Sequence, residues 1–263
     1  MIFNVLRAKI HCKMWNFLNA APGIFSKRLQ SQYERAAANT GVPDGFTVTC
    51  HSGALGTMQN SISSVKTALE WGARVIEVDV SFRPDGEAVI IHNSTPMQYQ
   101  GTEFESVLKQ VKMYPECSMN LDLKAFWNVA EIDRLVEKYQ LSDRVFYTGV
   151  SRKQVREVSH GSVIPYFLNE QPDIKRLDDR EYAQQLSDDI KQLGAVGLNC
   201  QYKHISRIIT DVLHENGLKV SVWTVNSRQS QCEMLSFGVD NITTLKPEAL
   251  YKYVLKSGSE GLK

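Results

Sequence analysis

The chain has 263 residues and is 43% hydrophobic, which provides enough apolar surface for one large core. Its 30 lysines and arginines nearly balance its 29 aspartates and glutamates, so the charge does not indicate a general nucleic-acid-binding protein. The five cysteines are scattered without a C-x-x-C pair, which argues against a disulfide framework or a zinc site and is typical of buried thiols in a reducing compartment.

Residues 1–46 differ from the rest of the chain. Apolar and aromatic side chains recur there at loosely helical intervals until Pro22-Gly23, and residues 26–39 then have the pattern of a polar helix. We expect a helical N-terminal extension over residues 1–46 and a barrel domain over residues 47–256. The apolar face of the first helix suits peripheral contact with a membrane surface or a dimer interface, and the sequence leaves both, and the oligomeric state, open.

Membrane-spanning and secreted proteins have apolar segments that this sequence lacks. No stretch approaches the roughly 18 apolar residues of a membrane span. Charged and polar residues interrupt the first twenty positions, so we expect no secretory signal. Together with the cysteine pattern, this predicts a cytoplasmic protein without a transmembrane segment.

From residue 46 onward, strand and helix patterns alternate. The predicted strands are 46–51, 74–81, 117–124, 144–149, 163–168, 195–200, 219–225 and 240–244. The predicted helices are 60–71, 103–112, 129–139, 152–158, 178–192, 206–216, 228–236 and 247–255. Eight strands rich in Val, Ile and Leu, each followed by a helix, predict a parallel sheet covered by helices, that is, an α/β fold of the (β/α)8 TIM barrel type.

The stretch from Val75 to His92 is the most informative part of the chain. Side chains alternate along a strand, so Glu77 and Asp79 point to the same face of the sheet. Asp85-Gly86 predicts a two-residue hairpin loop, which would pair His92 with Asp79. The count of eight barrel strands requires that this returning arm, 88–92, stand outside the barrel.

Polar side chains gather at the carboxyl ends of the predicted strands, where barrels of this class carry their sites. We expect the six ionisable groups to meet at one mouth: His51, Glu77, Asp79, His92, Asp122 and Lys124. The seventh strand carries Trp223 and Asn226.

These residue types suit metal-assisted chemistry on an anion. Glu77, Asp79 and Asp122 offer hard oxygen ligands, which suit Mg²⁺ or Ca²⁺; an ion-pair network with Lys124 and no metal is the alternative. His51 and His92 are candidates for base and acid because histidine titrates near neutrality. Lys124 would hold an anionic group such as a phosphate, and Trp223 would either line the substrate or pack in the core. The remaining histidines are expected to be structural: His11, His160, His204 and His214.

In this order, these residues resemble the glycerophosphodiester phosphodiesterase family, a TIM-barrel family of the phospholipase-C-like phosphodiesterase superfamily. The motifs that carry the resemblance over residues 47–250 are His51-Ser52-Gly53, Gln59-Asn60-Ser61, Gly72-Ala73 with Glu77-x-Asp79-Val80, Asp85-Gly86 with His92-Asn93, Asp122-Leu123-Lys124, Trp223-Thr224-Val225-Asn226 and Gly238-Val239-Asp240.

The resemblance implies a metal-dependent phosphodiesterase that converts glycerophosphodiesters, such as glycerophosphocholine, to glycerol 3-phosphate and an alcohol. Carried over, His51 and His92 are base and acid, Glu77, Asp79 and Asp122 bind Mg²⁺ or Ca²⁺, and Lys124 holds the phosphate. In the usual mechanism, the neighbouring glycerol hydroxyl attacks phosphorus first, and water then opens the cyclic product.

The sequence also departs from the family. Ser52 stands where the family has an arginine that helps to hold the phosphate, a charge-assisted contact worth about 1.5–3 kcal/mol. Arg83 or another basic residue is a candidate to compensate. Gln59 replaces a glutamate, while Asn93 and Leu245 replace aspartates. The short segment between His92 and the third strand predicts a more open pocket than in most members.

Two alternatives follow from these departures. One is a phospholipase-D-like enzyme that acts on lysophospholipid or sphingomyelin. The other is a barrel without catalysis that only binds an anionic ligand or a partner, which the loss of the arginine at position 52 supports and the intact histidines, carboxylates and lysine oppose.

Overall fold

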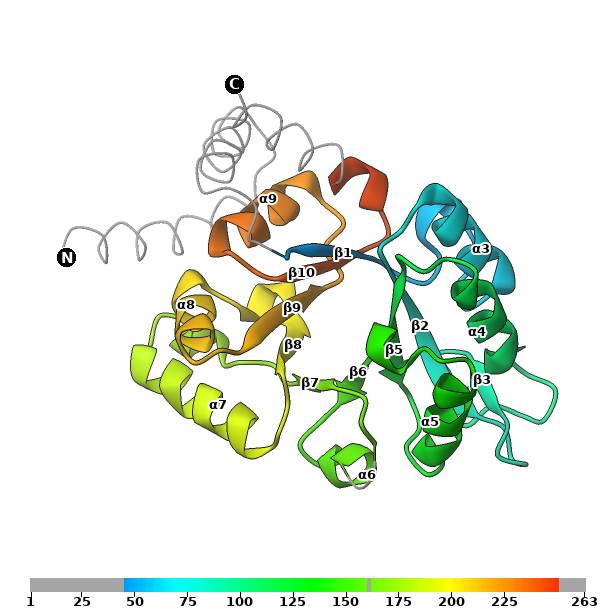
Figure 1. Cartoon of the computed structure of the whole chain (residues 1–263). Coiled ribbons are helices and arrows are strands. Elements are labelled where there is room, and N and C mark those ends of the chain that lie inside the picture. The colour runs from blue at the N-terminus through cyan, green and yellow to red at the C-terminus, as the bar shows by residue number, and fades with distance from the viewer. Residues whose placement is uncertain (1–44, 160–161, 251–263) are drawn as a thin grey trace.

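The protein is described by a computed structural model over residues 45–159 and 162–250, and the described strands close into a parallel barrel (Figure 1). The sheet runs β1-β2-β5-β6-β7-β8-β9-β10, and β10 pairs back with β1. Its strands are β1 (Thr47–Cys50), β2 (Val75–Phe82), β5 (Ser118–Leu123), β6 (Val145–Val150), β7 (Tyr166–Asn169), β8 (Gly197–Gln201), β9 (Lys219–Trp223) and β10 (Asn241–Thr244). The predicted (β/α)8 TIM barrel is therefore confirmed, with every predicted strand present.

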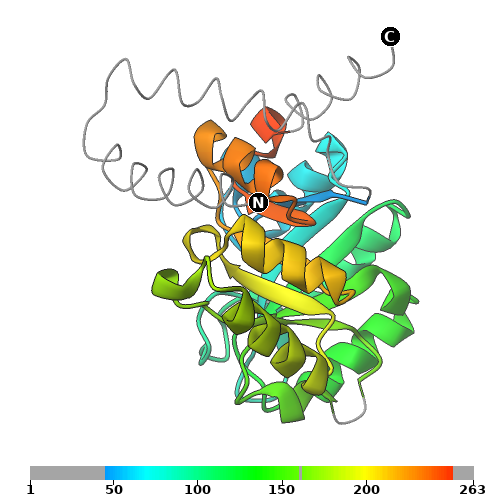
Figure 2. The same cartoon turned by 90° about the vertical axis from the view of Figure 1, so that its left-hand side faces the viewer.

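Helices cover the outside of this barrel, as both views show (Figures 1 and 2). They are α3 (Ile62–Trp71), α4 (Phe104–Lys112), α5 (Val129–Lys138), α6 (Val155–Ser159), α7 (Arg180–Gln192), α8 (Arg207–Glu215) and α9 (Arg228–Phe237). The described part of the last predicted helix, 247–250, is also helical. The predicted N-terminal extension falls on residues 1–44, outside the described residues, so the extension and the predicted domain boundaries stay predictions.

Polar residues start several of these helices. Ser61, Asp179, Ser206 and Ser227 each occupy an N-cap position, and each side chain accepts a hydrogen bond from a backbone N–H of the first turn. A cap of this kind contributes about 1 kcal/mol because it satisfies an amide that has no partner inside the helix. These caps fix where the connections after β1, β7, β8 and β9 end.

The hairpin above the barrel differs from the predicted one by one residue. β2 continues into β3 (Ala88–Ile90), which pairs with the short β4 (Thr102–Glu103), but Phe82 lies opposite Ala88. Three residues form the loop, because Gly86 adopts a left-handed conformation at φ 91° and donates its N–H to Arg83. The predicted two-residue loop was therefore wrong. The backbone of Asp79 faces Ile91, whose N–H donates to the Asp79 carbonyl at 2.9 Å, and does not face His92.

The barrel interior contains a layer of hydrogen-bonded polar side chains. Asn241 accepts from Thr49 at 2.8 Å and donates to Ser221 at 2.9 Å. On the other side of the barrel, Thr148 donates to Asn120 at 2.7 Å. These groups are buried but paired, so they are stable in the interior and form a polar floor beneath the mouth.

The described cysteines are buried, as the sequence predicts. Cys50, Cys117 and Cys200 are buried free thiols, and burial raises the pKa of Cys50 to about 12 and that of Cys117 to about 11. Over the same residues, no helix has both the length and the apolarity needed to cross a bilayer. Cytoplasmic localisation stays a prediction.

Candidate active site

A cavity of about 710 Å³ opens at the carboxyl ends of the barrel strands. The seven residues predicted to bind or act all line it: His51, Glu77, Asp79, His92, Asp122, Lys124 and Trp223. They come from segments far apart in the sequence, which the closed barrel places around one mouth.

Three carboxylates meet on neighbouring strands. Asp79 of β2 and Asp122 of β5 are direct partners in the parallel ladder, and Glu77 lies two residues before Asp79 on the same face. One oxygen of each lies within 4.8 Å of the other two. Glu77 and Asp79 are each 4% exposed, so both are removed from bulk water.

Burial and repulsion act strongly on these carboxylates. Burial, and then the charges of Asp79 and Asp122, raise the pKa of Glu77 well above its usual range. Burial also raises the pKa of Asp122, more than the neighbouring Lys124 lowers it. Burial would raise the pKa of Asp79 too, but the Lys124 ammonium and the Asn60 amide outweigh it and lower that pKa. Burial and mutual repulsion therefore disfavour the charged forms of Glu77 and Asp122, which a further cation at the cluster would stabilise.

Lys124 is the cation that the chain itself supplies. Its ammonium lies 2.9 Å from Asp79 and 2.7 Å from Asp122. Burial would lower its pKa, but the two carboxylates raise it above the usual value, so the side chain stays charged. The alternative of an ion-pair network is thus present in the structure. In this network Lys124 pairs with Asp79 and Asp122, whereas the Glu77 carboxylate lies 3.8 Å from His51 Nδ1.

The same carboxylates fit a divalent cation. Two oxygens bound to one Ca²⁺ at 2.3–2.6 Å lie at most about 5 Å apart, which the cluster satisfies. Asp122 Oδ1 is buried and has no hydrogen-bond partner among the described residues, while Lys124 bonds the other oxygen. Lys124 therefore leaves one oxygen of Asp122 for a second cation. An all-oxygen donor set of this kind suits Mg²⁺ or Ca²⁺.

The two histidines lie beside different carboxylates. His51 Nδ1 lies 2.7 Å from the carbonyl of Ser52 and 3.8 Å from Glu77 Oε2. Because a carbonyl only accepts, Nδ1 carries the hydrogen, and Nε2 is left as an acceptor. His92 Nδ1 lies 3.3 Å from Asp79 Oδ2, and its side chain is 77% exposed. The shifted hairpin register thus changes the backbone neighbours of His92 but still delivers its imidazole to Asp79.

Three site residues were not singled out from the sequence. Asn120 lines the cavity two residues before Asp122, on the same face of β5, a place that strand alternation could have indicated. Gly149 has φ 79° at a register shift between β6 and β7, and a Cβ there would lie 2.5 Å from Asp122 Oδ1. Asn60, noted only as part of a motif, binds Asp79 on both sides: its Nδ2 donates to Asp79 Oδ2 at 2.7 Å, and its Oδ1 accepts from the Asp79 N–H at 3.0 Å.

Two predicted contributors lie elsewhere. Arg83 donates to the carbonyls of Gln100 and Gly101 at 2.9 Å and pairs with Glu87, so it ties the hairpin together and does not line the cavity. The expectation that Arg83 compensates for Ser52 is wrong. Asn226 accepts from the Leu245 N–H at 2.9 Å and holds the end of β10.

Among the histidines expected to be structural, two fall within the described residues. His204 Nδ1 bonds the Pro172 carbonyl at 2.8 Å, and His214 pairs with Asp240 at 2.8 Å. Neither lines the cavity. His11 and His160 lie outside the described residues.

Comparison with known proteins covers most of the chain. Residues 102–249 match the glycerophosphoryl diester phosphodiesterase family, and residues 49–120 match the X domain of phosphatidylinositol-specific phospholipase C. A glycerophosphodiester phosphodiesterase of Caldanaerobacter subterraneus subsp. tengcongensis is 25% identical over 232 residues, which cover 76% of this chain and 93% of that protein.

Solved structures share the fold. A glycerophosphodiester phosphodiesterase from Parabacteroides distasonis has a TM-score of 0.65 at 22% identity and covers 83% of this chain and 100% of its own. An Oleispira antarctica phosphodiesterase in complex with the product sn-glycerol-3-phosphate has a TM-score of 0.66 at 17% identity, with 82% and 98% covered. Since the family match extends over more than half of the chain and includes Asp122, Lys124 and Trp223, the chain belongs to the glycerophosphoryl diester phosphodiesterase family and so to the phosphoric diester hydrolases.

Proposed function

We propose that the protein hydrolyses glycerophosphodiesters to glycerol 3-phosphate and an alcohol with the help of Mg²⁺ or Ca²⁺. The observation that carries this proposal is the convergence of two histidines, three carboxylates and one lysine on a single cavity in a member of this family. The relative from Oleispira antarctica, whose structure contains sn-glycerol-3-phosphate, supports the proposed product.

Glu77, Asp79 and Asp122 would hold the metal, and Lys124 would bind a phosphate oxygen. When bound, a divalent cation supplies positive charge that stabilises the charge developing on the phosphoryl oxygens. Lys124 is the one lysine or arginine among the residues that line the described cavity. Its position against Asp79 and Asp122 keeps the ammonium charged and aligned beside the carboxylates.

His51 and His92 would move the protons. His51 Nε2, left as an acceptor by the Nδ1 contact with Ser52, takes the proton of the glycerol hydroxyl that attacks phosphorus. The bond from phosphorus to the leaving oxygen breaks, and a proton from His92 neutralises that oxygen. Water then opens the cyclic diester with the two histidine roles reversed. Asp79, 3.3 Å from His92 Nδ1, orients the exposed imidazole.

Turnover tests this function directly. The purified protein with Mg²⁺ or Ca²⁺ is expected to hydrolyse glycerophosphocholine, with glycerol 3-phosphate as product. His51→Ala and Glu77→Ala should abolish the activity, while His204→Ala, which alters a histidine outside the cavity, should not. A folded protein that binds the metal and turns over neither glycerophosphocholine, lysophosphatidylcholine nor bis-p-nitrophenyl phosphate would instead be a binding protein.

A second candidate function is hydrolysis of lysophospholipids, and exposed apolar side chains beside the cavity favour it. Met58, Met97, Tyr99 and Trp127 are 73%, 56%, 78% and 61% exposed. The segments that carry them, 52–61, 93–101 and 125–128, contain no Asp, Glu, Lys or Arg. Aromatic and apolar side chains in uncharged loops suit the interface between lipid and water.

These four side chains are grouped around the hairpin. Met58 and His92 line one hollow, Gln98 bonds Asp85 at the hairpin tip, and a Cβ on Gly86 would lie 4.0 Å from Trp127. A Met97→Ser and Tyr99→Ser double variant should therefore lose turnover of micellar lysophosphatidylcholine and keep turnover of glycerophosphocholine. Val163→Ser removes a side chain that is at least as exposed, at 86%, but lies in the connection before β7, at the amino end of that strand, and serves as control. Equal losses on both substrates would contradict this second function.

A further inference from the structure

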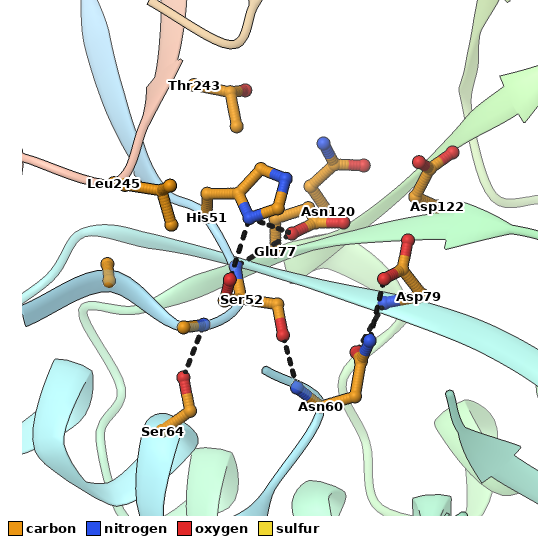
Figure 3. A network of polar contacts seen from close by, with 12 residues as sticks. His51, Ser52, Asn60, Ser64, Glu77, Asp79, Asn120, Asp122, Thr243 and Leu245 are labelled. Atoms are coloured by element: carbon orange, nitrogen blue, oxygen red, sulfur yellow. Dashed lines mark hydrogen bonds and ion pairs between the residues drawn. The ribbon is translucent and has the colours of Figure 1, made fainter. Parts of the chain in front are cut away.

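Ser52, which stands where the family has an arginine, contacts three parts of the site at once (Figure 3). Its carbonyl contacts His51 Nδ1 at 2.7 Å, and its N–H donates to Glu77 Oε2 at 2.9 Å. Its hydroxyl accepts from the N–H of Asn60 at 2.5 Å. The first two contacts use the backbone and are open to any residue other than proline, but the third requires the serine side chain.

The hydroxyl of Ser52 points away from the cavity. The residue is 3% exposed and is not among the lining residues, and Figure 3 shows its Oγ turned toward Asn60. A side chain in this direction does not reach a phosphate held at the mouth. Position 52 therefore does not hold a shortened substitute for the family's cation; its side chain forms a different contact.

That contact leads to a metal carboxylate. Asn60 has a left-handed backbone at φ 50°, a conformation that asparagine tolerates better than most residues. From this position, its amide clamps Asp79 with two hydrogen bonds, of 2.7 Å and 3.0 Å. The loop after β1 is thus fixed to β2 at Glu77 through the Ser52 backbone and at Asp79 through Asn60.

We propose that Ser52 is a positioning residue that sets Asp79 through Asn60 and thereby determines metal affinity in this chain. The proposal rests on the proposed function, because it takes Glu77, Asp79 and Asp122 as the metal ligands. Partners behind metal ligands typically contribute about 10–100-fold to metal affinity or activity when they are removed. Without the hydroxyl, the Asn60 N–H loses its buried acceptor, and the loop that carries the clamp shifts or loosens.

The test is a double-mutant cycle read by calorimetric titration with Mg²⁺ and with Ca²⁺. Ser52→Ala should weaken metal binding about 10-fold, and Ser52→Thr, which keeps the hydroxyl, should restore it. Asn60→Gly removes the clamp and tolerates the left-handed backbone. In the Asn60→Gly background, Ser52→Ala should have little further effect, because the path to Asp79 is already cut.

Ser206→Ala is the matched control. Its hydroxyl also accepts from a backbone N–H, of Ile209 at the start of α8, so its loss costs similar stability without touching the cavity. Metal affinity in Ser206→Ala should equal that of the unaltered protein. Equal affinity in Ser52→Ala and the unaltered protein, or full additivity with Asn60→Gly, would overturn the proposal.

A further variant separates the two explanations of position 52. If serine there were a lost phosphate contact, Ser52→Arg would lower KM and leave metal affinity unchanged. The positioning role predicts the reverse, a loss of metal affinity, because arginine breaks the contact with Asn60. Glycerophosphocholine turnover by the unaltered protein is measured in parallel: its absence would refute the proposed function, while the titrations still decide the role of Ser52.

Discussion

Gly149→Ala tests whether the close approach of the Gly149 backbone fixes the position of the Asp122 carboxylate. A Cβ at position 149 would lie 2.5 Å from Asp122 Oδ1 and 2.5 Å from the carbonyl oxygen of Leu123, two atoms that cannot yield cheaply because one is a site carboxylate and the other is backbone. The left-handed backbone, at φ 79°, adds about 1–2 kcal/mol of strain for any residue with a Cβ. Overpacking of this kind costs about 1–3 kcal/mol more.

We therefore expect Gly149→Ala to lower the free energy of unfolding by about 2–5 kcal/mol, the sum of these two costs. The better way to relieve the collision is to move Asp122, so metal affinity and turnover should fall as well. Urea unfolding measures the first quantity, and calorimetric titration with Ca²⁺ measures the second.

Gly217→Ala isolates the collision from the backbone strain. Gly217 has nearly the same φ, 74°, but a Cβ there would meet no atom of the described residues within 4 Å. This control should lose only about 1–2 kcal/mol of stability, with metal affinity intact. If Gly149→Ala were no less stable than Gly217→Ala and bound metal normally, the inferred contact between Gly149 and Asp122 would be refuted.

Three further predictions use other side chains of the site and the barrel. Lys124→Met leaves Asp79 and Asp122 without their cation; it should destabilise the metal-free protein by about 3 kcal/mol in urea unfolding, and added Ca²⁺ should recover part of the loss. Trp223→Phe removes a buried indole N–H and wall area, so KM should rise while Ca²⁺ affinity measured by calorimetry stays constant. Burial raises the pKa of Glu233 from 4.5 to about 7, so the folded state holds this proton more tightly, and stability falls as pH rises from 4.5 to 7. Glu233→Gln should remove on the order of 1–3 kcal/mol of that fall, and an unchanged pH profile of unfolding would contradict the shift.

Most of the fold was predictable because its signals are local. Each barrel strand contains Val, Ile or Leu. Most helices have amphipathic spacing, and several begin at a cap such as Ser61 or Ser206. The polar interior was also signalled, because Asn120 and Asn241 occupy inward positions by simple alternation. Gly149 was a weaker signal: an isolated glycine in a strand indicates a bulge or a close approach, but the sequence does not show which atom approaches.

Contacts between loops could not be predicted in the same way. Arg83 and Ser52 illustrate this limit. As a cation beside the site, Arg83 fits the role of a phosphate ligand on sequence alone, yet the hairpin carbonyls of Gln100 and Gly101 hold it elsewhere. Compared with the family's arginine, Ser52 looks on sequence alone like the loss of a phosphate contact. Its role depends on the direction of its hydroxyl, which accepts a hydrogen bond from the backbone N–H of Asn60.

The hairpin shows why a wrong register still gave the right neighbour. A shift of one residue reverses the faces of all side chains inside a paired ladder, but β3 ends at Ile90, before His92. Beyond the ladder, the chain is free to turn, and the imidazole reaches Asp79 from a segment that is not constrained by strand alternation. The position of His92 is therefore set by the length of the returning arm and by the three-residue loop at Gly86. Insertion of one residue in that loop should move His92 away from Asp79 without disturbing Glu77, whose contacts come from β5 and the loop after β1.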